Sequence, residues 1–333
     1  MTDDLRIEAR APSVDEFRRI VAAVDWHELA AHDDEVLRRS LDAALFTVCA
    51  VDGDECIGCV RVIGDGGLHF YVEEVAVVPA WQGRGAGRRL MQAVVDWLAD
   101  AAPPGAAVEL LTGRDRADFY GRFGFKWQGA GVMRWRPDGG GEPASRAGSR
   151  AGGEHGAPAG VRGGDRSEAP GPTRGAPPEA APLPGPGVEV VLVDRVPTPA
   201  EERRLFEAVG WYGELPDDDE ELAAALDRSL FAVCAVADGA VVGCARVVGD
   251  GAVYLYVQDV IVLPAWQGTG LGDRLMQAVM GWLDACCPPN AFVALFAAPD
   301  RDGFYRRYGF ELRPLDEPGM AQQWRGPGSW QRE

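Results

Sequence analysis

Two long stretches of the chain repeat one pattern of hydrophobic and polar positions. In each stretch, an apolar strand and helical periodicity are followed by three β-rich runs and a long amphipathic helix. The first stretch predicts strands at 5–9, 45–51, 56–63, 68–78 and 107–111, helices at 13–24, 33–41, 85–101 and 114–123, and a final strand pair. The second begins likewise, with a strand at 188–193 and helices at 198–209 and 217–226. This pattern predicts a mixed α/β (α+β) class with a largely antiparallel first part of the sheet.

The repeat has a constant spacing of 185 residues. Gly58 to Leu98 aligns with Gly243 to Leu283 without a gap, and 26 of the 41 positions are identical. A period this long is that of a complete domain rather than of a stacked solenoid repeat. We therefore predict two copies of one domain, at residues 1–136 and 188–333.

Residues 137–187 separate the two copies and consist mainly of Gly, Pro, Ala, Arg, Ser and Glu. This composition predicts a disordered linker, because it offers too little apolar surface to offset the entropy of ordering. A flexible coil of about 50 residues spans on the order of 40 Å, so an intramolecular pseudo-dimer of the two domains is permitted but not required. We expect no core contact to cross between the halves, and each half to fold by itself.

Charge and composition limit the classes of molecule that the protein is expected to bind. With 33 basic and 51 acidic residues, the net charge of −18 repels nucleic acids and anionic membranes and favours a cationic small molecule. No apolar run is long enough to span a membrane, and Met1–Asp4 has no signal-peptide character, so we expect a cytoplasmic protein. The spacings of Cys56 with Cys59 and of His27 with His32 complete no metal motif, and no metal is expected.

A glycine-rich loop joins the third β-rich run to the long helix in both copies. Gln82-Gly83-Arg84-Gly85-Ala86-Gly87 returns as Gln267-Gly268-Thr269-Gly270-Leu271-Gly272. Glycines at alternate positions before a helix leave backbone N–H groups uncovered at the positive end of its dipole, where a phosphate or pyrophosphate binds. A tight turn without a ligand is the alternative. The loop has neither the G-K-[ST] of a P-loop nor the spacing of a dinucleotide-binding fingerprint.

The residues around the loop carry a family resemblance. Val77-Val78-Pro79 precedes the loop, and Phe119-Tyr120-Gly121-Arg122-Phe123-Gly124-Phe125 follows the long helix and next strand, with equivalents in the second copy. In both copies the chain resembles the GNAT superfamily of acyl-CoA-dependent N-acetyltransferases. The repeated R-V-[IV]-G-D-G and Pro318-Gly319-Met320 further resemble small bacterial acetyltransferases related to plastid arylalkylamine acetyltransferases. The resemblance implies a sheet that splays after its fourth strand, with the pantetheine arm of acetyl-CoA (coenzyme A) in the split and its pyrophosphate on the glycine loop.

The resemblance also implies which residues contact the cofactor, namely a strand segment that supplies an oxyanion donor and the glycine loop. In the first copy these are Val75, Ala76, Val77, Gln82, Gly83, Arg84, Gly85, Ala86, Gly87 and Arg88. In the second copy they are Val260, Ile261, Val262, Gln267, Gly268, Thr269, Gly270, Leu271 and Gly272. Because Thr269 and Asp273 stand where the first copy has Arg84 and Arg88, we expect the first copy to bind coenzyme A more tightly.

Acetyl transfer to an amine needs a group that accepts the ammonium proton and a group that protonates the leaving thiolate. The candidate bases are Glu73, Glu74 and, in the second copy, Asp259. By resemblance the Glu73 position acts as base through water, but the second copy has Gln258 there. The alternative for these carboxylates is a solvated face or an ion pair with Arg61 or Arg246. The resemblance assigns the acid to Tyr120 or Tyr305, whose alternative role is aromatic packing.

These features predict an N-acetyltransferase that transfers acetyl from acetyl-CoA to a primary amine of a small molecule, by direct attack on the thioester. Two alternatives stay open: an acyl-CoA-binding regulatory or scaffold protein without turnover, and an enzyme with one catalytic and one structural copy. The acidic runs 33–35 and 217–221 either favour a cationic acceptor or begin solvated helices.

Overall fold

The computed structural model describes residues 5–127, 132–135, 187–211, 215–298, 300–312 and 320–323. The predicted linker at 137–187 lies outside the described residues, apart from Gly187. The N-terminal unit contains strands β1 (Leu5–Glu8), β2 (Phe46–Asp52), β3 (Glu55–Gly64), β4 (His69–Val77), β5 (Ala107–Leu111), β6 (Lys126–Trp127) and β7 (Val132–Trp135). Its helices are α1 (Val14–Ala23), α2 (His27–Ala30), α3 (Asp34–Asp42), α4 (Ala86–Ala101) and α5 (Ala117–Gly121), with 3-10 turns at Pro79–Trp81 and Arg114–Arg116.

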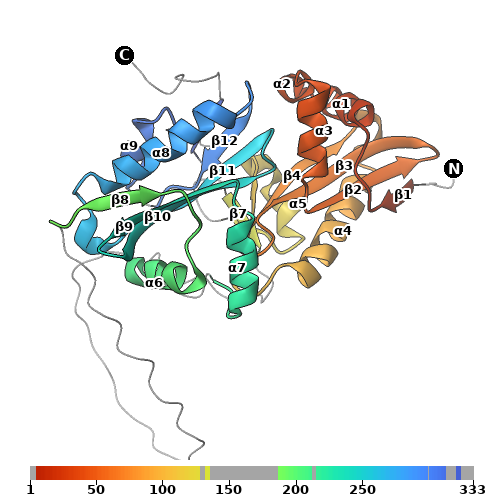
Figure 1. Cartoon of the computed structure of the whole chain (residues 1–333). Helices are drawn as coiled ribbons and strands as arrows, with labels where there is room; N and C mark the ends of the chain where they lie inside the picture. Colours follow the sequence, from red (N-terminus) through yellow and green to blue (C-terminus); the bar gives the residue numbers. More distant parts are fainter. Residues whose placement is uncertain are drawn as a thin grey trace, which may run out of the picture.

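The C-terminal unit repeats this order of strands (Figure 1). Its strands are β8 (Val190–Val193), β9 (Phe231–Ala237), β10 (Ala240–Gly249), β11 (Tyr254–Val262), β12 (Phe292–Leu295), β13 (Glu311–Leu312) and β14 (Met320–Gln323). Its helices are α6 (Pro199–Val209), α7 (Asp219–Asp227), α8 (Leu271–Cys286) and α9 (Asp302–Arg306), with a 3-10 turn at Pro264–Trp266. The predicted fold class is confirmed, and the helix predicted at 114–123 is a 3-10 turn followed by a shorter α5.

Each unit has one mixed sheet of seven strands, in the order β1-β2-β3-β4-β5-β7-β6 and β8-β9-β10-β11-β12-β14-β13. The first four strands of each sheet are antiparallel, and β4 with β5, like β11 with β12, is the parallel pair. In the N-terminal unit, α4 and α5 pack on one face of the sheet and α1 and α3 on the other. The alternation of strand side chains explains this: Val48 and Ala50 face α4, whereas Cys49 and Val51 face α1 and α3.

Local sequence sets where the helices begin. At α1, Ser13 accepts from the Glu16 backbone N–H at 3.2 Å and the Glu16 carboxylate accepts from the Ser13 N–H at 2.7 Å, which is a capping box. Thr198 and Glu201 form the same box at α6. The acidic run before α7 likewise begins a helix, since Asp218 accepts from the Glu220 N–H at 2.7 Å.

The two units share a buried core, so the expectation that no core contact crosses between the halves is wrong. Leu68, in the loop before β4, is buried against Leu222, Ala225 and Leu226 of α7. On the other side, Ala252 and Val253 join the core that α1 and α3 form with their sheet. Each loop carries apolar residues that its own domain leaves uncovered, and the helix of the other domain covers them. The expectation was based on the composition of the linker, which does not indicate whether the surfaces of the two domains contact each other.

Candidate active site

The sheet of each domain opens between its fourth and fifth strands. β4 pairs with β5 only from His69 to Tyr71, although it continues along β3 to Val77. β11 pairs with β12 only from Tyr254 to Tyr256. In the described part of the chain, the rest of β4 and β11 has no ladder partner on that side. The split that the resemblance implied is therefore present in both domains.

A β-bulge lies at this opening. The register of β3 against β4 shifts between Cys59 and Arg61, and Glu74 on the facing strand has a φ of 44°. The second domain has the same shift, with Asp259 at a φ of 51°. Left-handed backbone is uncommon for residues other than glycine, and bulges bend a strand and redirect its side chains. The bulge therefore determines which residues of β4 and β11 face the split.

The glycine loop leaves open space over the start of the following helix. Gly83 and Gly85 have φ values of 73° and 89°, and Gly268 and Gly270 have values of 76° and 84°. A Cβ added at any of these four positions would meet no atom within 4 Å. The first-turn N–H groups of α4 and α8 have no partner within the helix. Open space, left-handed glycines and unpaired amides together fit a pyrophosphate group.

The predicted loop glutamines hold the loop in place. Gln82 Nε2 donates to the carbonyl of Val77 at 2.8 Å, and Gln267 Nε2 donates to the carbonyl of Val262 at 3.0 Å. Each glutamine thus ties the loop to the end of the preceding strand. Their contribution to a ligand site is to fix the position of the backbone.

The two loops differ in charge as the sequence indicates. In the first domain, the exposed Arg84 lies over the Trp81 ring at 5.1 Å. In the first turn of α8, Asp273 instead accepts from the Tyr308 hydroxyl at 2.6 Å and forms an ion pair with Arg307 at 2.9 Å. The second helix start therefore already has a carboxylate near its N-terminus, which opposes a second anion there.

Glu73 lies on β4 directly before the bulge and is partly buried. Its Oε1 accepts a hydrogen bond from the Tyr256 hydroxyl of the C-terminal domain. Burial raises the pKa of the Glu73 carboxyl to about 8, and the charge of Glu74 acts in the same direction, while Tyr256 and Arg61 lower it. A carboxyl with this pKa exchanges its proton near neutral pH, as a general base requires.

Tyr120, on α5, packs in the core of the first domain and is influenced by the charge of Glu73. Its buried ring meets Phe119 and Phe125 edge-on, with centroids 5.0 Å and 6.4 Å away. Burial raises the pKa of Tyr120 to about 12, Arg116 lowers it, and the charge of Glu73 raises it. The hydroxyl therefore stays protonated at neutral pH while the ring packs. The candidate base and the candidate acid of the first domain therefore interact electrostatically.

The second domain lacks this combination. Gln258 occupies the position of Glu73, and its Nε2 donates to the Tyr71 hydroxyl of the first domain. Burial also raises the pKa of Tyr305 to about 12, and Arg301 acts to lower it. An amide does not take up a proton near neutral pH, so the Gln258 side chain offers no general base.

Glu74 and Asp259 are in buried ion pairs, which is the alternative that the sequence left open for them. Arg61 donates to the two Glu74 carboxylate oxygens at 2.5 Å and 2.6 Å. Arg246 Nε donates to Asp259 at 2.6 Å. Although burial alone would raise the pKa of Asp259, Arg246 and His69 hold it well below its usual range. Both carboxylates are thus engaged by neighbouring cations.

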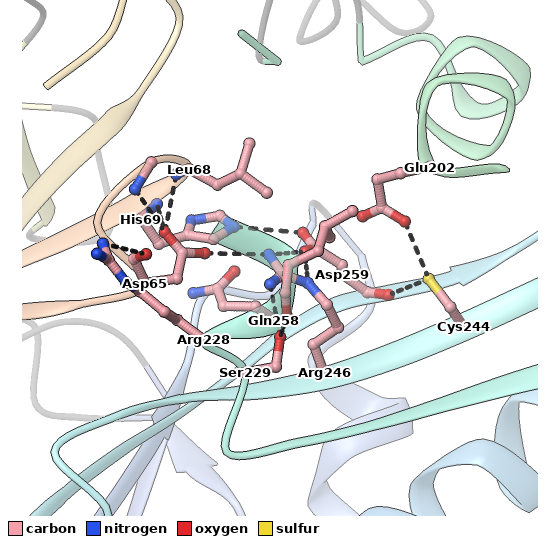
Figure 2. Close-up of polar contacts among 12 residues, drawn as sticks. Asp65, Leu68, His69, Glu202, Arg228, Ser229, Cys244, Arg246, Gln258 and Asp259 are labelled. Carbon is pink, nitrogen blue, oxygen red and sulfur yellow. Dashed lines mark hydrogen bonds and ion pairs between the residues drawn. The ribbon is translucent and has the colours of Figure 1, made fainter. Parts of the chain in front are cut away.

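The charged network between the domains was missed from the sequence. Figure 2 shows Arg246 beside both Asp259 of its own domain and Asp65 of the other, at 2.6 Å and 3.2 Å. The reciprocal pair joins Arg61 to Asp250 at 3.5 Å. Arg61, Asp65, Arg246 and Asp250 belong to R-V-[IV]-G-D-G, and the occurrence of this motif in both copies was the available signal. The repeated motif identified a family resemblance. The sequence does not reveal that the aspartate of each motif forms an ion pair with the arginine of the motif in the other copy.

The comparison with known families decides the assignment. The chain matches the model described as the acetyltransferase (GNAT) domain over residues 42–127 and 228–312, just over half of its length. The chain belongs to the GNAT acetyltransferase family. Its members use acetyl-CoA, and this chain contains two copies of the family domain.

Curated relatives match parts of this GNAT protein. It is 37% identical over 107 residues to serotonin N-acetyltransferase 2, chloroplastic, of Oryza sativa subsp. japonica, which covers 31% of this chain and 52% of the rice protein. It is 37% identical over 80 residues to GCN5-related N-acetyltransferase 1, chloroplastic, of Arabidopsis thaliana, covering 24% and 40% of the two chains. The chain spans about half the length of these relatives.

Solved structures resemble it either by one domain or over both. An acetyltransferase of the GNAT family from Streptococcus pneumoniae is 34% identical, covers 37% of this chain and 89% of its own, and gives a TM-score of 0.31. A GCN5-related N-acetyltransferase from Sphaerobacter thermophilus is 18% identical over 96% of both chains, with a TM-score of 0.47. A tandem GNAT protein from the clavulanic acid biosynthesis pathway is 15% identical over 96% of both, also with a TM-score of 0.47.

The described residues contain neither a membrane-spanning helix nor a cluster of metal ligands. None of the helices there is long and apolar enough to cross a membrane. The same residues contain no group of three or more His, Cys, Asp or Glu side chains that could hold a metal ion.

Proposed function

We propose that the protein is an N-acetyltransferase that transfers the acetyl group of acetyl-CoA to a primary amine of a small molecule, and that the N-terminal domain is the catalytic copy. The observation that carries this proposal is the position of Glu73 on β4 at the split of the first sheet, where it accepts a hydrogen bond from Tyr256 and has its pKa raised to about 8. The second domain has Gln258 at that position.

The first domain binds the cofactor through its backbone. The glycine loop and the first turn of α4 receive the pyrophosphate, assisted by the exposed charges of Arg84 and Arg88. The amides of 75–77, beyond the bulge, hold the acetyl carbonyl in the split. Bound acetyl-CoA supplies the activated acetyl group, and no nucleophilic side chain is needed.

Glu73 and Tyr120 then move the protons. The acceptor enters as an ammonium ion, and Glu73 takes its proton, directly or through water, so that the neutral amine can react. A Glu73 carboxyl with a pKa of about 8 is a strong enough base for this transfer and is still partly ionised at pH 7. The Tyr120 hydroxyl, protonated throughout this range, donates a proton to the departing thiolate.

The acceptor belongs to the class of small amines. A net charge of −18 favours a cationic acceptor, and the rice relative is named as a serotonin N-acetyltransferase, which supports arylalkylamines as first candidates. Thiol release from acetyl-CoA should therefore be measured with tryptamine, tyramine, putrescine, an aminoglycoside and a peptide with a free N-terminus.

Matched variants test where the reaction occurs. Glu73→Gln should lower kcat by about 10²-fold or more, since general bases typically contribute 10²–10⁴-fold, whereas Gln258→Ala should keep the wild-type rate. If Gln258→Ala loses turnover and Glu73→Gln retains it, catalysis is in the second domain. Stabilisation by coenzyme A without turnover on any acceptor would instead favour the binding-protein alternative.

A further inference from the structure

Two tyrosines face each other where the domains meet. Tyr71 on β4 and Tyr256 on β11 occupy equivalent positions, 185 residues apart. Their rings stack with centroids 3.6 Å apart and an interplanar angle of 4°. A residue that packs against its own equivalent lies on the pseudo-twofold axis that relates the two copies. Each hydroxyl therefore reaches into the other domain.

The two hydroxyls meet different groups. The Tyr256 hydroxyl donates to Oε1 of Glu73, whereas the Tyr71 hydroxyl accepts from Nε2 of Gln258. Burial holds the pKa of Tyr256 well above its ordinary value, so its hydroxyl keeps its proton and donates to the carboxylate. The two equivalent contacts therefore differ in effect. Tyr256 contacts a titratable carboxyl in the first domain, whereas Tyr71 contacts an amide in the second.

Polar contacts hold the loop before β11, the strand that carries Tyr256, against the first domain. Asp250, in the loop before β11, accepts through Oδ1 from the backbone N–H groups of residues 252–254, and through Oδ2 from Ser40 of the first domain at 2.5 Å. The same Oδ2 lies 3.5 Å from Arg61. Arg61 in turn holds Glu74, the neighbour of Glu73. The second domain is therefore bound to the bulge that carries the proposed base.

We propose that Tyr256 of the C-terminal domain is a positioning residue of the N-terminal catalytic site, whose hydrogen bond orients the Glu73 carboxylate and favours its ionised form. The inference rests on the proposed function of Glu73. It gives the second domain a role in catalysis without a reaction of its own, because the hydroxyl that contacts the base comes from β11. The two domains then form one catalytic unit.

Other groups also act on Glu73 and must stay unchanged in a test. The ionisable groups that face it from its own strand, from β3, from α5 and from the other domain are Glu74, Arg61, Tyr120, Asp250 and Tyr254. Tyr256→Phe removes one hydroxyl and leaves all of these in place. Tyr71→Phe removes the equivalent hydroxyl of the same ring stack and leaves the contact with Glu73 intact, so it is the matched control.

The test is the dependence of kcat on pH, with acetyl-CoA and the best amine of the panel at saturation. Loss of a hydrogen bond to the ionised form raises the pKa of a carboxyl, so Tyr256→Phe should move the acid limb of the profile upward by about one unit. At a fixed pH on that limb, this is about a tenfold loss of rate. Tyr71→Phe should leave the limb unmoved. All variants use the same acceptor, whose own titration cancels in the comparison.

The position of the limb does not depend on how much of a variant folds, which separates the proposed role from a structural one. An unmoved limb in Tyr256→Phe, or equal shifts in both variants, would overturn the inference while leaving the proposed function standing. A wild-type protein without turnover on any acceptor would overturn both. As a second measure, Tyr256→Phe should lower the residual rate of Glu73→Gln by less than twofold, and a full loss there would also contradict the proposal.

Discussion

At the scale of single residues, the adjacent residues Glu73 and Glu74 of β4 lie in different environments. Glu73 lies at the split with a raised pKa, and Glu74 is buried in an ion pair with Arg61 on the face that α1 covers. The sequence placed both on one strand but left both as candidate bases. Simple alternation separates adjacent side chains, but the bulge that re-aims them depends on a register shift that no pattern of residue types specifies.

The first prediction concerns Tyr120. Tyr120→Phe keeps the ring between Phe119 and Phe125 and removes the hydroxyl proposed to protonate the thiolate. We expect kcat to fall by about 10²-fold or more, with little change in melting temperature, because general acids contribute 10²–10⁴-fold and the packing is retained. Tyr305→Phe is the control and should keep wild-type kcat. Equal activity of both variants would remove tyrosine from the mechanism.

At the scale of elements, the sequence predicted the glycine loops well because their chemistry is local. Left-handed backbone at Gly83 and Gly85, and a helix that starts directly after them, follow from glycine spacing within one turn. The elements themselves follow from hydrophobic period and capping residues such as Ser13. What the spacing could not show is that Gln82 binds the strand end, since that contact needs the loop closed in space.

The second prediction concerns the first loop. Gly85→Glu should weaken coenzyme A binding to the first domain by about tenfold or more, because its carboxylate would project into the open space that receives the pyrophosphate. Gly85→Ala has the same strained φ without the charge, so it measures the effect of strain alone. Calorimetry should show the tighter class of sites disappear in Gly85→Glu and persist in Gly270→Glu.

Salt gives that experiment an independent readout. Arg84 is exposed at the first loop, whereas Asp273 is near the start of α8 in the second. The advantage of the first site should therefore shrink as ionic strength rises, because exposed charges are screened within about 10 Å at 0.1 M salt. A difference between the sites that does not depend on salt would mean that loop charge does not set their order.

At the scale of the whole molecule, the sequence predicted two domains but not their contact. The sequence predicted a β-rich run at 68–78, but it could not show that residues of the other copy cover Leu68, Tyr71 and Val253. The exchanged pairs of Arg61 with Asp250 and of Arg246 with Asp65 require the three-dimensional relation between the copies. In the sequence, a residue buried in the core of one domain has the same apolar pattern as a residue buried at the interface between the two domains.

The third prediction follows from the symmetry of this contact. Residues 1–140 contain Arg61, Asp65 and Tyr71, so two copies of this half can form the same exchanged pairs and ring stack with each other. We expect the isolated half to form a homodimer at micromolar concentration, because as a monomer it would expose Leu68 and leave Arg61 without the carboxylate of its exchanged pair. Sedimentation velocity measures this directly.

Two further measurements make the prediction specific. Asp65→Arg within residues 1–140 should give a monomer, since it places two cations where the exchanged pair would form. Adding residues 186–333 to the wild-type half should convert the homodimer into a heterodimer, restore the contact of Tyr256 with Glu73 and raise the rate of acetyl transfer above that of either half. A half of residues 1–140 that stays monomeric and melts at the temperature of the full chain would show that the shared core contributes little stability. Each GNAT domain would then be an independent folding unit, despite the charges exchanged between them.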